Sequence, residues 1–177
     1  GAKKLKVLAI FDKLSTYKQI LFNSMLEALD NNAEITICLH EQNVDMLEYF
    51  LNENLDNFDY YVITPHFPLD TLTQKKVCSL LRKIPNRKLL MLDNWMKQIH
   101  GNYGAVYQDW ESDTAKGLSE GLDTLKNYKR INVITLPSSL YSKFIRTGVE
   151  RFCDENGIKV RFADKVSRDT VQKGEVY

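Results

Sequence analysis

The chain has 177 residues, of which 44% are hydrophobic and 27% charged, a composition that excludes an intrinsically disordered protein. Lysine and arginine number 24 against 23 acidic residues, for a formal net charge of +1. This balance argues against holding nucleic acid by bulk charge, because counterion release needs a concentrated basic face. No apolar run reaches the roughly 20 residues of a membrane span, and no signal peptide is visible. We therefore expect a cytoplasmic protein without a membrane partner.

Motifs of nucleotide-binding and hydrolytic enzymes are missing from the sequence. There is no GxGxxG or GxxxxGK loop for phosphates and no GxSxG elbow for a nucleophile. The three cysteines, Cys38, Cys78 and Cys153, lie inside apolar runs without metal-ligand spacing, which predicts buried thiols in a reducing compartment. We expect no catalytic residue, no metal and no cofactor.

Short apolar runs alternate with longer helical patterns along the chain, which is typical of a doubly wound parallel α/β sheet. The first run, 5–11, is apolar at consecutive positions, as a strand buried on both faces would be. Expected strands, in chain order, are 5–11, 34–39, 60–64, 89–92, 105–108, 131–136 and 159–162. Expected helices are 17–28, 44–51, 72–82, 113–126 and 141–155, with a further helix beginning in 170–174.

Details of the helical patterns give more specific expectations. Tyr17, Leu21, Met25 and Ala28 recur at helical spacing and are expected on one buried stripe. Two glycines one turn apart, Gly117 and Gly121, are costly inside a helix, which favours a close helix contact there. The pair Asn156–Gly157 is expected to end its helix, with the glycine in the left-handed conformation.

The short polar stretch 126–129 (KNYK) is interpreted as the boundary between two lobes. Residues 4–126 are expected to form one parallel sheet with strand order 2-1-3-4-5 and helices on both faces. Residues 130–177 are too few to bury an α/β core alone, so the second lobe is expected to be incomplete. An uncovered sheet edge of that kind favours association with a second copy of the chain.

Ligands of doubly wound sheets bind outside the carboxyl ends of the strands. The residues that follow the expected strands combine carboxylates, hydroxyls and both tryptophans, a mixture that suits a small polyhydroxylated ligand. Three of these residues also have a purely structural interpretation: Asp109 as a helix cap, Trp95 packed on a neighbouring loop and His66 as a hydrogen-bonded loop histidine. Candidates at this edge are Asp12, Lys13, His66, Asp93, Trp95, Asp109, Trp110, Ser138 and Tyr141.

In their order, KVLAIF, EITICL, YYVITP, KLLMLDNW and SKFIRTGVERFCDENGI resemble the periplasmic-binding-protein-like sensor domain of bacterial transcription regulators. This is the lactose/galactose-repressor type, also found fused to winged-helix DNA-binding domains of the GntR class. The most specific stretch is 106–134, a strand with V-x-x-D, a small-residue helix and a turn before the next strand. That turn is Asn127–Ile131, where the family usually reads G-H-x-x-I. The resemblance covers residues 4–164.

This resemblance implies two flavodoxin-like lobes with a small effector, often a sugar or sugar phosphate, in the cleft between them. It also implies a DNA-binding domain before the first lobe and a homodimer formed through the lobes. By position, Asp12, Lys13 and Tyr17 match the first cleft loop, Asp93 and Asp109 match acidic effector contacts, and Ser138, Ser139 and Tyr141 match the second-lobe loop. The family's effector-binding arginine, three residues before the helix glycine, is Ile145 in this chain.

A ligand-sensing module of a sugar-responsive regulator is therefore the first hypothesis. A solute-binding protein of a sugar transport system shares the fold and is the second. A flavodoxin-like enzyme is the third, and bound flavin would reveal it by absorbance.

Overall fold

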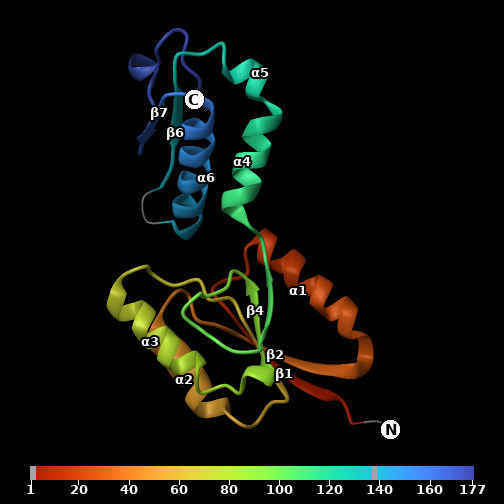
Figure 1. Ribbon diagram of the computed structural model, residues 1–177. Coiled ribbons are helices and arrows are strands. Elements are labelled where there is room, and N and C mark those ends of the chain that lie inside the picture. Colours follow the sequence, from red (N-terminus) through yellow and green to blue (C-terminus); the bar gives the residue numbers. More distant parts are fainter. Residues whose placement is uncertain (1–2, 137–138) are drawn as a thin grey trace. The chain divides into compact units, whose positions relative to one another are not determined.

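The computed structural model describes residues 3–136 and 139–177 (Figure 1). By their contacts, the residues fall into two compact units that divide between Gln108 and Asp109. Each unit has its own parallel sheet. No helix in the described ranges is long and apolar enough to cross a bilayer.

Five parallel strands form the sheet of the first unit in the order β2-β1-β3-β4-β5, which confirms the predicted order. Strand β1 lies between β2 and β3 and places Val7 opposite Ile35 of β2 and Tyr60 of β3. The strands are β1 (Leu5–Phe11), β2 (Ala33–Leu39), β3 (Tyr60–Ile63), β4 (Leu89–Asp93) and β5 (Gly104–Tyr107). The helices are α1 (Thr16–Leu29), α2 (Val44–Asn54) and α3 (Thr71–Leu81), with short 3-10 turns at Asp30–Asn32 and Asn86–Lys88.

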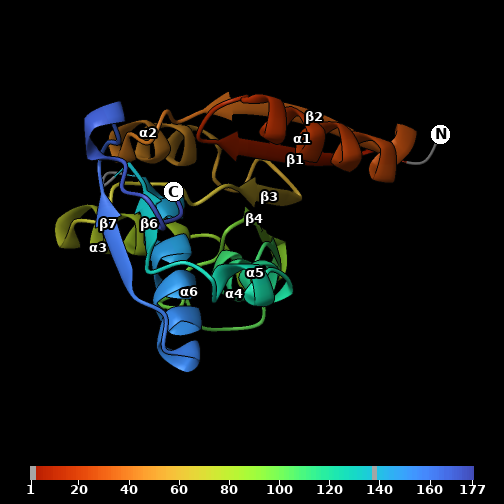
Figure 2. The ribbon, with the colours of Figure 1, turned by 90° about the horizontal axis from the view of Figure 1, so that it is seen from above.

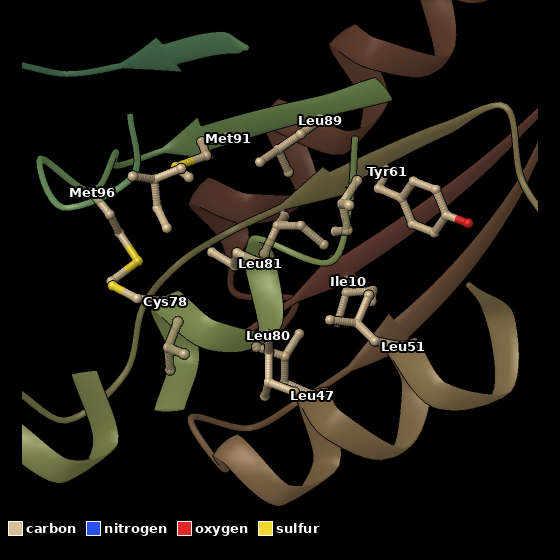
Figure 3. Packing of buried hydrophobic residues seen from close by; sticks show 14 of the residues in the cluster. Ile10, Leu47, Leu51, Tyr61, Cys78, Leu80, Leu81, Leu89, Met91 and Met96 are labelled. Carbon is tan, nitrogen blue, oxygen red and sulfur yellow. The ribbon is translucent and has the colours of Figure 1, made fainter. Parts of the chain in front are cut away.

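Helices cover both faces of this sheet, as Figure 1 shows. On one face, Leu47 and Leu51 of α2 and Leu80 of α3 pack against strand residues such as Ile10 and Met91 (Figure 3). The other face is smaller and apolar, and α1 alone among the three helices packs its side chains there. Its buried members are Val7, Ala9, Phe11, Val62 and Leu92. The alternation along β1 explains the division, because successive strand side chains point to opposite faces.

Helix α1 departs from the predicted stripe at both ends. Leu21 and Met25 pack on the sheet as expected, but Tyr17 and Ala28 are exposed. The one fully buried residue of the helix is Lys18. It lies one turn before Leu21 and two turns before Met25, so it belongs to the same helical face. The predicted stripe therefore began one residue too early.

The second unit pairs two parallel strands with two long helices (Figure 2). Its elements are α4 (Trp110–Glu120), α5 (Leu122–Leu125), β6 (Ile131–Ile134), α6 (Leu140–Asn156), β7 (Val160–Ala163) and a 3-10 turn at Arg168–Thr170. The predicted helix 113–126 is thus two segments separated at Gly121 and begins earlier, at Trp110. Its core joins Ala115 of α4, Val149 and Phe152 of α6 and Ile131 of β6.

No helix begins in 170–174, so that prediction is wrong. After the 3-10 turn, the chain instead runs along the free edge of β6, where Val176 pairs in parallel with Ile131. The Val176 amide donates to Arg130 O at 3.0 Å, and the Asn132 amide donates to Val176 O at 2.8 Å. Backbone pairing at a strand edge outweighs the weak helical pattern of this short segment.

Glycine at position 148 permits the close contact between α4 and α6. A Cβ atom there would lie 2.4 Å from Glu111 O and 3.0 Å from Thr114 Cβ. By contrast, a Cβ on Gly117 would meet nothing within 4 Å, so the predicted close contact at that glycine is wrong. Gly157 ends α6 with φ 65°, in the left-handed conformation that the sequence predicts.

The compact units differ from the lobe limits 4–126 and 130–177 expected from the polar stretch KNYK. Helix α4 packs on α6 through Ala115, Val149 and Phe152, so it belongs to the second unit. The polar stretch is therefore a loop inside that unit. Cys78 and Cys153 are buried, Cys38 is partly buried, and all three are free thiols.

Candidate functional site

Polar side chains from four neighbouring strands meet at the carboxyl edge of the first sheet. His40 follows β2, Asp12 follows β1, Thr64 and His66 follow β3, and Asp93 is the last residue of β4. The strand order β2-β1-β3-β4 places these ends side by side. All five residues are buried, although they are polar.

Lys18 joins two of these strand ends by ion pairs. Its Nζ lies 2.8 Å from Asp12 Oδ1 and 2.8 Å from Asp93 Oδ2. The three side chains are at most 1% exposed. A buried charge is tolerated only when it is paired and hydrogen-bonded, and this ammonium has a carboxylate on either side.

The Asp12 carboxylate receives further hydrogen bonds. Thr64 Oγ1 donates to Asp12 Oδ1 at 3.0 Å and accepts from the Asp12 amide at 2.7 Å. His66 Nδ1 lies 3.3 Å from Asp12 Oδ2. Burial by itself raises the pKa of Asp12, but the hydrogen bonds from His66, Lys18 and Thr64 and the Lys18 charge hold it well below its usual range. Asp12 therefore remains a carboxylate at neutral pH.

His40 supports this edge from the β2 side. The Gln42 amide donates to His40 Nδ1 at 3.0 Å, so the ring proton is on Nε2, which donates to Thr64 O at 2.9 Å. The imidazole stacks on Phe67 with ring centroids 4.1 Å apart. Burial lowers the pKa of His40 to about 4, more than the hydrogen bond to Thr64 raises it, so the ring is neutral at pH 7.

Asp93 combines a strained backbone with an exposed neighbour. Its φ of 74° is in the left-handed region, which is uncommon for residues other than glycine and often occurs at functional sites. Burial and the Asp93 carboxylate raise the pKa of Tyr17 to about 12. Beside the two residues is a hollow of about 160 Å³, which Asp93 and Tyr17 line together with Leu21, Val106, Tyr107 and Gln108.

Two other predicted residues of the first unit lie outside the ion-pair network. Lys13 is exposed. Trp95 is partly buried against the core, and its ring lies 5.6 Å from that of Tyr107, which lines the hollow. These contacts match the alternative interpretation of Trp95, in which its ring packs on a neighbouring segment.

The second unit holds the remaining predicted residues. Asp109 is exposed and caps α4, since its Oδ1 accepts from the Ser112 amide at 3.1 Å. Trp110 and Tyr141, in the first turns of α4 and α6, have ring centroids 5.2 Å apart. The Trp110 Nε1 is buried without a hydrogen-bond partner among the described residues. Ser138 lies outside the described residues.

Sequence reasoning missed Lys18, Thr64 and His40 as members of the site. For Lys18 a signal existed: it is the only lysine at a position in register with the apolar face of α1. A lysine on such a face needs a buried anion, and Asp12 lies just before the helix. Thr64 ended a predicted strand, and His40 followed one, but neither position by itself indicates a hydrogen bond across strands.

The arrangement offers fixed hydrogen-bond acceptors and donors at the end of a parallel sheet. In the described part of the chain, no three His, Cys, Asp or Glu side chains have the geometry of a metal site. Carboxylates, phenols and amides of this kind recognise hydroxyl groups, and tryptophan or tyrosine rings stack on the C–H faces of sugars.

Comparisons with solved structures find the same fold in sugar-responsive regulators. The trehalose repressor from Escherichia coli superposes with a TM-score of 0.68 at 14% identity, over 91% of this chain and 60% of that chain. A LacI family transcriptional regulator from Lactobacillus casei with bound sucrose gives 0.62 at 9% identity, over 97% of this chain and 57% of that one. The Cra regulator from Pseudomonas putida in complex with fructose 1-phosphate superposes with a TM-score of 0.62 at 14% identity, over 89% of this chain and 56% of that chain.

A fructose-binding periplasmic domain of a hybrid two-component system also matches, with a TM-score of 0.66 at 12% identity, over 90% of this chain and 52% of that chain. No protein-family model and no curated protein matches the sequence. The resemblance predicted from the motifs is thus confirmed at the level of the fold, the periplasmic-binding-protein type I fold of LacI-type sensor domains. The chain spans about 60% of the length of the regulators that it matches.

Proposed function

We propose that this chain is the ligand-sensing part of a cytoplasmic transcription regulator and that it binds a small sugar or sugar derivative. The observation that carries the proposal is the buried network of Asp12, Lys18 and Asp93 at the carboxyl edge of a sheet. Ligands of such sheets bind at that edge. Binding would control a separate DNA-binding domain, and the chain itself would perform no reaction.

Structures with the same fold support a carbohydrate effector. Relatives at this fold level are described with sucrose, glucose and fructose 1-phosphate bound. We propose Asp12, Lys13, Tyr17, His66, Asp93 and Trp95 on the first unit as effector contacts, and Asp109, Trp110, Ser138 and Tyr141 on the second. The neighbouring rings of Trp110 and Tyr141 are tilted by 59° to each other, and the buried indole N–H lacks a partner among the described residues, so this pair suits one face of a sugar ring.

Intrinsic fluorescence and thermal melting test the proposal directly. Both tryptophans are among the proposed contacts, so a bound sugar should change the emission as it excludes water from the indole rings. A ligand at 100 times its Kd adds about 2.7 kcal/mol to the free energy of unfolding, which shifts Tm measurably. We expect a response to one or a few members of a panel of mono- and disaccharides. A panel without any response in either measurement contradicts the proposal.

Asp109 needs a separate experiment, because its hydrogen bond to the Ser112 amide would explain this residue without any contact to an effector. Asp109→Ala removes the acceptor for the Ser112 amide and should lower Tm in either case. If the carboxylate also binds effector hydroxyls, the Kd for the effector rises. An unchanged Kd assigns Asp109 to the cap alone.

We also propose that two copies of the chain associate. Edge strand β5 is exposed along its whole length, and Val106 and Tyr107 are 59% and 49% exposed. Free strand edges with apolar side chains favour pairing with another chain. Analytical ultracentrifugation at increasing concentration should show a dimer. A monomer at every concentration contradicts the proposed association.

A solute-binding protein of a transport system is the second candidate, because a periplasmic sugar-binding domain has the same fold. The sequence of the full gene product separates the two, since a winged helix or helix-turn-helix favours the regulator. A bound flavin, seen as absorbance in the near ultraviolet and blue, would instead favour an enzyme.

A further inference from the structure

The hollow beside Asp93 offers only uncharged and anionic groups to a ligand. Its polar lining residues are Tyr17, Tyr107, Gln108 and Asp93, and the Asp93 side chain is itself only 1% exposed. Leu21 and Val106 complete it, and no lysine or arginine is among these lining residues. A phosphate group generally needs at least one cationic partner or several backbone amides.

The lysine behind the hollow does not provide that cation. Lys18 Nζ is within 2.8 Å of both Asp12 and Asp93, and its side chain is 1% exposed. Two carboxylates and one ammonium sum to a formal charge of −1. The hydrogen bonds of Asp12 keep that carboxyl ionised at neutral pH, so protonation does not cancel the negative charge.

We infer that the effector presents a neutral, hydroxyl-bearing group to this hollow and that the site discriminates against phosphorylated sugars. The inference rests on the proposed sensor function and narrows its ligand class. Hydroxyls can exchange hydrogen bonds with the Tyr17 phenol and the Gln108 amide, and such bonds need no counterion. A phosphate dianion would approach the net negative cluster of Asp12, Lys18 and Asp93 without a cationic partner among the residues that line the hollow.

Lys13 follows β1 at this edge of the sheet and is not among the residues that line the hollow. Its side chain is exposed. A solvated ammonium attracts an anion only weakly at physiological salt, because the charge is screened within about 8 Å.

Isothermal titration with matched sugar pairs tests the inference. The probes are glucose, fructose and trehalose, each beside its phosphate ester, in the same buffer. For the pair whose free sugar binds, we expect the phosphate ester to bind at least ten times more weakly, about 1.4 kcal/mol. A phosphate ester that binds as tightly as its free sugar, or more tightly, overturns the inference while the sensor function stands. If neither class binds, the sensor function fails, and the inference fails with it.

Charge variants separate repulsion from simple steric exclusion. Asp93→Asn removes one negative charge with little change in shape, so the preference for the free sugar over its ester should shrink several-fold. The matched control is Glu27→Gln, which removes an exposed carboxylate near the C-terminal end of α1. This variant should leave the preference for the free sugar unchanged. Melting curves without ligand show whether each variant is folded. An undiminished preference in folded Asp93→Asn would contradict the electrostatic explanation.

Salt provides the same test without any mutation. Repulsion between the ester and the cluster is screened at high ionic strength, so raising the salt from about 0.05 to about 0.5 M should narrow the difference in Kd. Affinity for the free sugar should change little. If the ester instead loses affinity as salt rises, it is held by a cation, and the inference is wrong.

Discussion

Lys18 connects three elements of the first unit through one ammonium group. Helix α1 carries it, Asp12 follows β1, and Asp93 ends β4. Without the ammonium, two buried carboxylates would face each other across the same space. The geometry of the candidate site therefore depends on a residue that is itself inaccessible to a ligand.

Replacing Lys18 by methionine should strongly destabilise the protein. Methionine fills similar space, but it leaves the Asp12 and Asp93 carboxylates without their shared counterion. Removing one partner of a buried ion pair costs about 3 to 5 kcal/mol. Urea unfolding followed by circular dichroism measures the change, with the exposed Lys75→Met on α3 as the control. A loss below about 1 kcal/mol would show that the carboxylates find other partners or take up protons.

His40 predicts a pH dependence of stability in a defined window. The folded protein holds the pKa of this histidine at about 4, below the ordinary value of 6.5. Between these values the unfolded chain binds more protons, so the free energy of unfolding falls as the pH drops from about 6.5 to about 4. The loss due to His40 is of the order of 3 kcal/mol. Above pH 6.5 His40 contributes no slope.

Urea unfolding between pH 4 and 7.5 measures that slope, and His40→Gln should flatten it. Asp12 contributes little to the slope above about pH 5, because its pKa is lowered in the folded state and its effect is lost mainly as the pH falls towards and below the ordinary value of 3.8. An identical slope in the variant would assign the pH dependence to another group.

Single positions at the strand ends could be predicted only in part. Asp12, His66 and Asp93 were recognised because parallel strands gather their carboxyl ends at one edge. To predict the pairing of Asp12 with Lys18, one must know which face of α1 points to the sheet. The apolar pattern of the helix left that face uncertain by one residue. Aspartate adopts the left-handed region more often than most residues, but this enrichment does not single out Asp93 among the acidic residues of the chain.

At the scale of elements, the α4–α6 pair shows how one glycine sets a helix contact. A Cβ at position 148 would overlap Glu111 O of α4, so the helices approach as closely as they do only without a side chain there. The same two helices carry Trp110 and Tyr141 in their first turns. The spacing of the two helices therefore sets the distance between the Trp110 and Tyr141 rings.

Gly148→Ala and Gly117→Ala should have opposite effects. The first forces α4 and α6 apart and should cost about 1 to 3 kcal/mol, as overpacking does. The second meets open space in a helix and should be neutral or stabilise by up to about 1 kcal/mol. Thermal unfolding of both variants provides the comparison. Equal effects of the two substitutions would mean that α4 shifts freely over α6.

Strands and helices with a strong apolar pattern were predicted well, whereas segments with a weak apolar pattern were not. All seven strands appear within a few residues of their predicted limits, because buried parallel strands are runs of apolar residues. The predicted helix 113–126 divides at Gly121, where glycine weakens the helix, and the segment after Thr170 pairs with β6 instead. A local residue, Gly121, decided the first outcome, and a pairing distant in the sequence, that of Val176 with Ile131, decided the second.

At the scale of the molecule, the two units have hydrophobic clusters that share no residue. The first unit buries two clusters, one on either face of its sheet, whereas the second buries a single small one. Stability rises with the amount of apolar surface buried, so the second unit should be the weaker. The strand order of the first sheet was predictable from the fold rules, but the division after Gln108 was not. That division depends on the packing of α4, and a polar loop within the second unit resembled a linker.

Differential scanning calorimetry should resolve two unfolding transitions, with the second unit unfolding at the lower temperature. Tryptophan emission can assign them, since Trp95 is in the first unit and Trp110 in the second. The variants Trp95→Phe and Trp110→Phe leave one reporter each. A single transition with a calorimetric enthalpy equal to the van't Hoff value would show that the units unfold together.

The double pairing of Lys18 also has a consequence for local opening of the native state. Helix ends normally fray with little cost, and their amide protons exchange rapidly with solvent. Here, opening the first turn of α1 would pull the ammonium away from both carboxylates at once and leave them buried and unneutralised. The amide of Gln19, which donates to Ser15 O, should therefore exchange as slowly as amides in the middle of the helix. We therefore expect the start of α1 and the end of β4 to open together, as one cooperative unit.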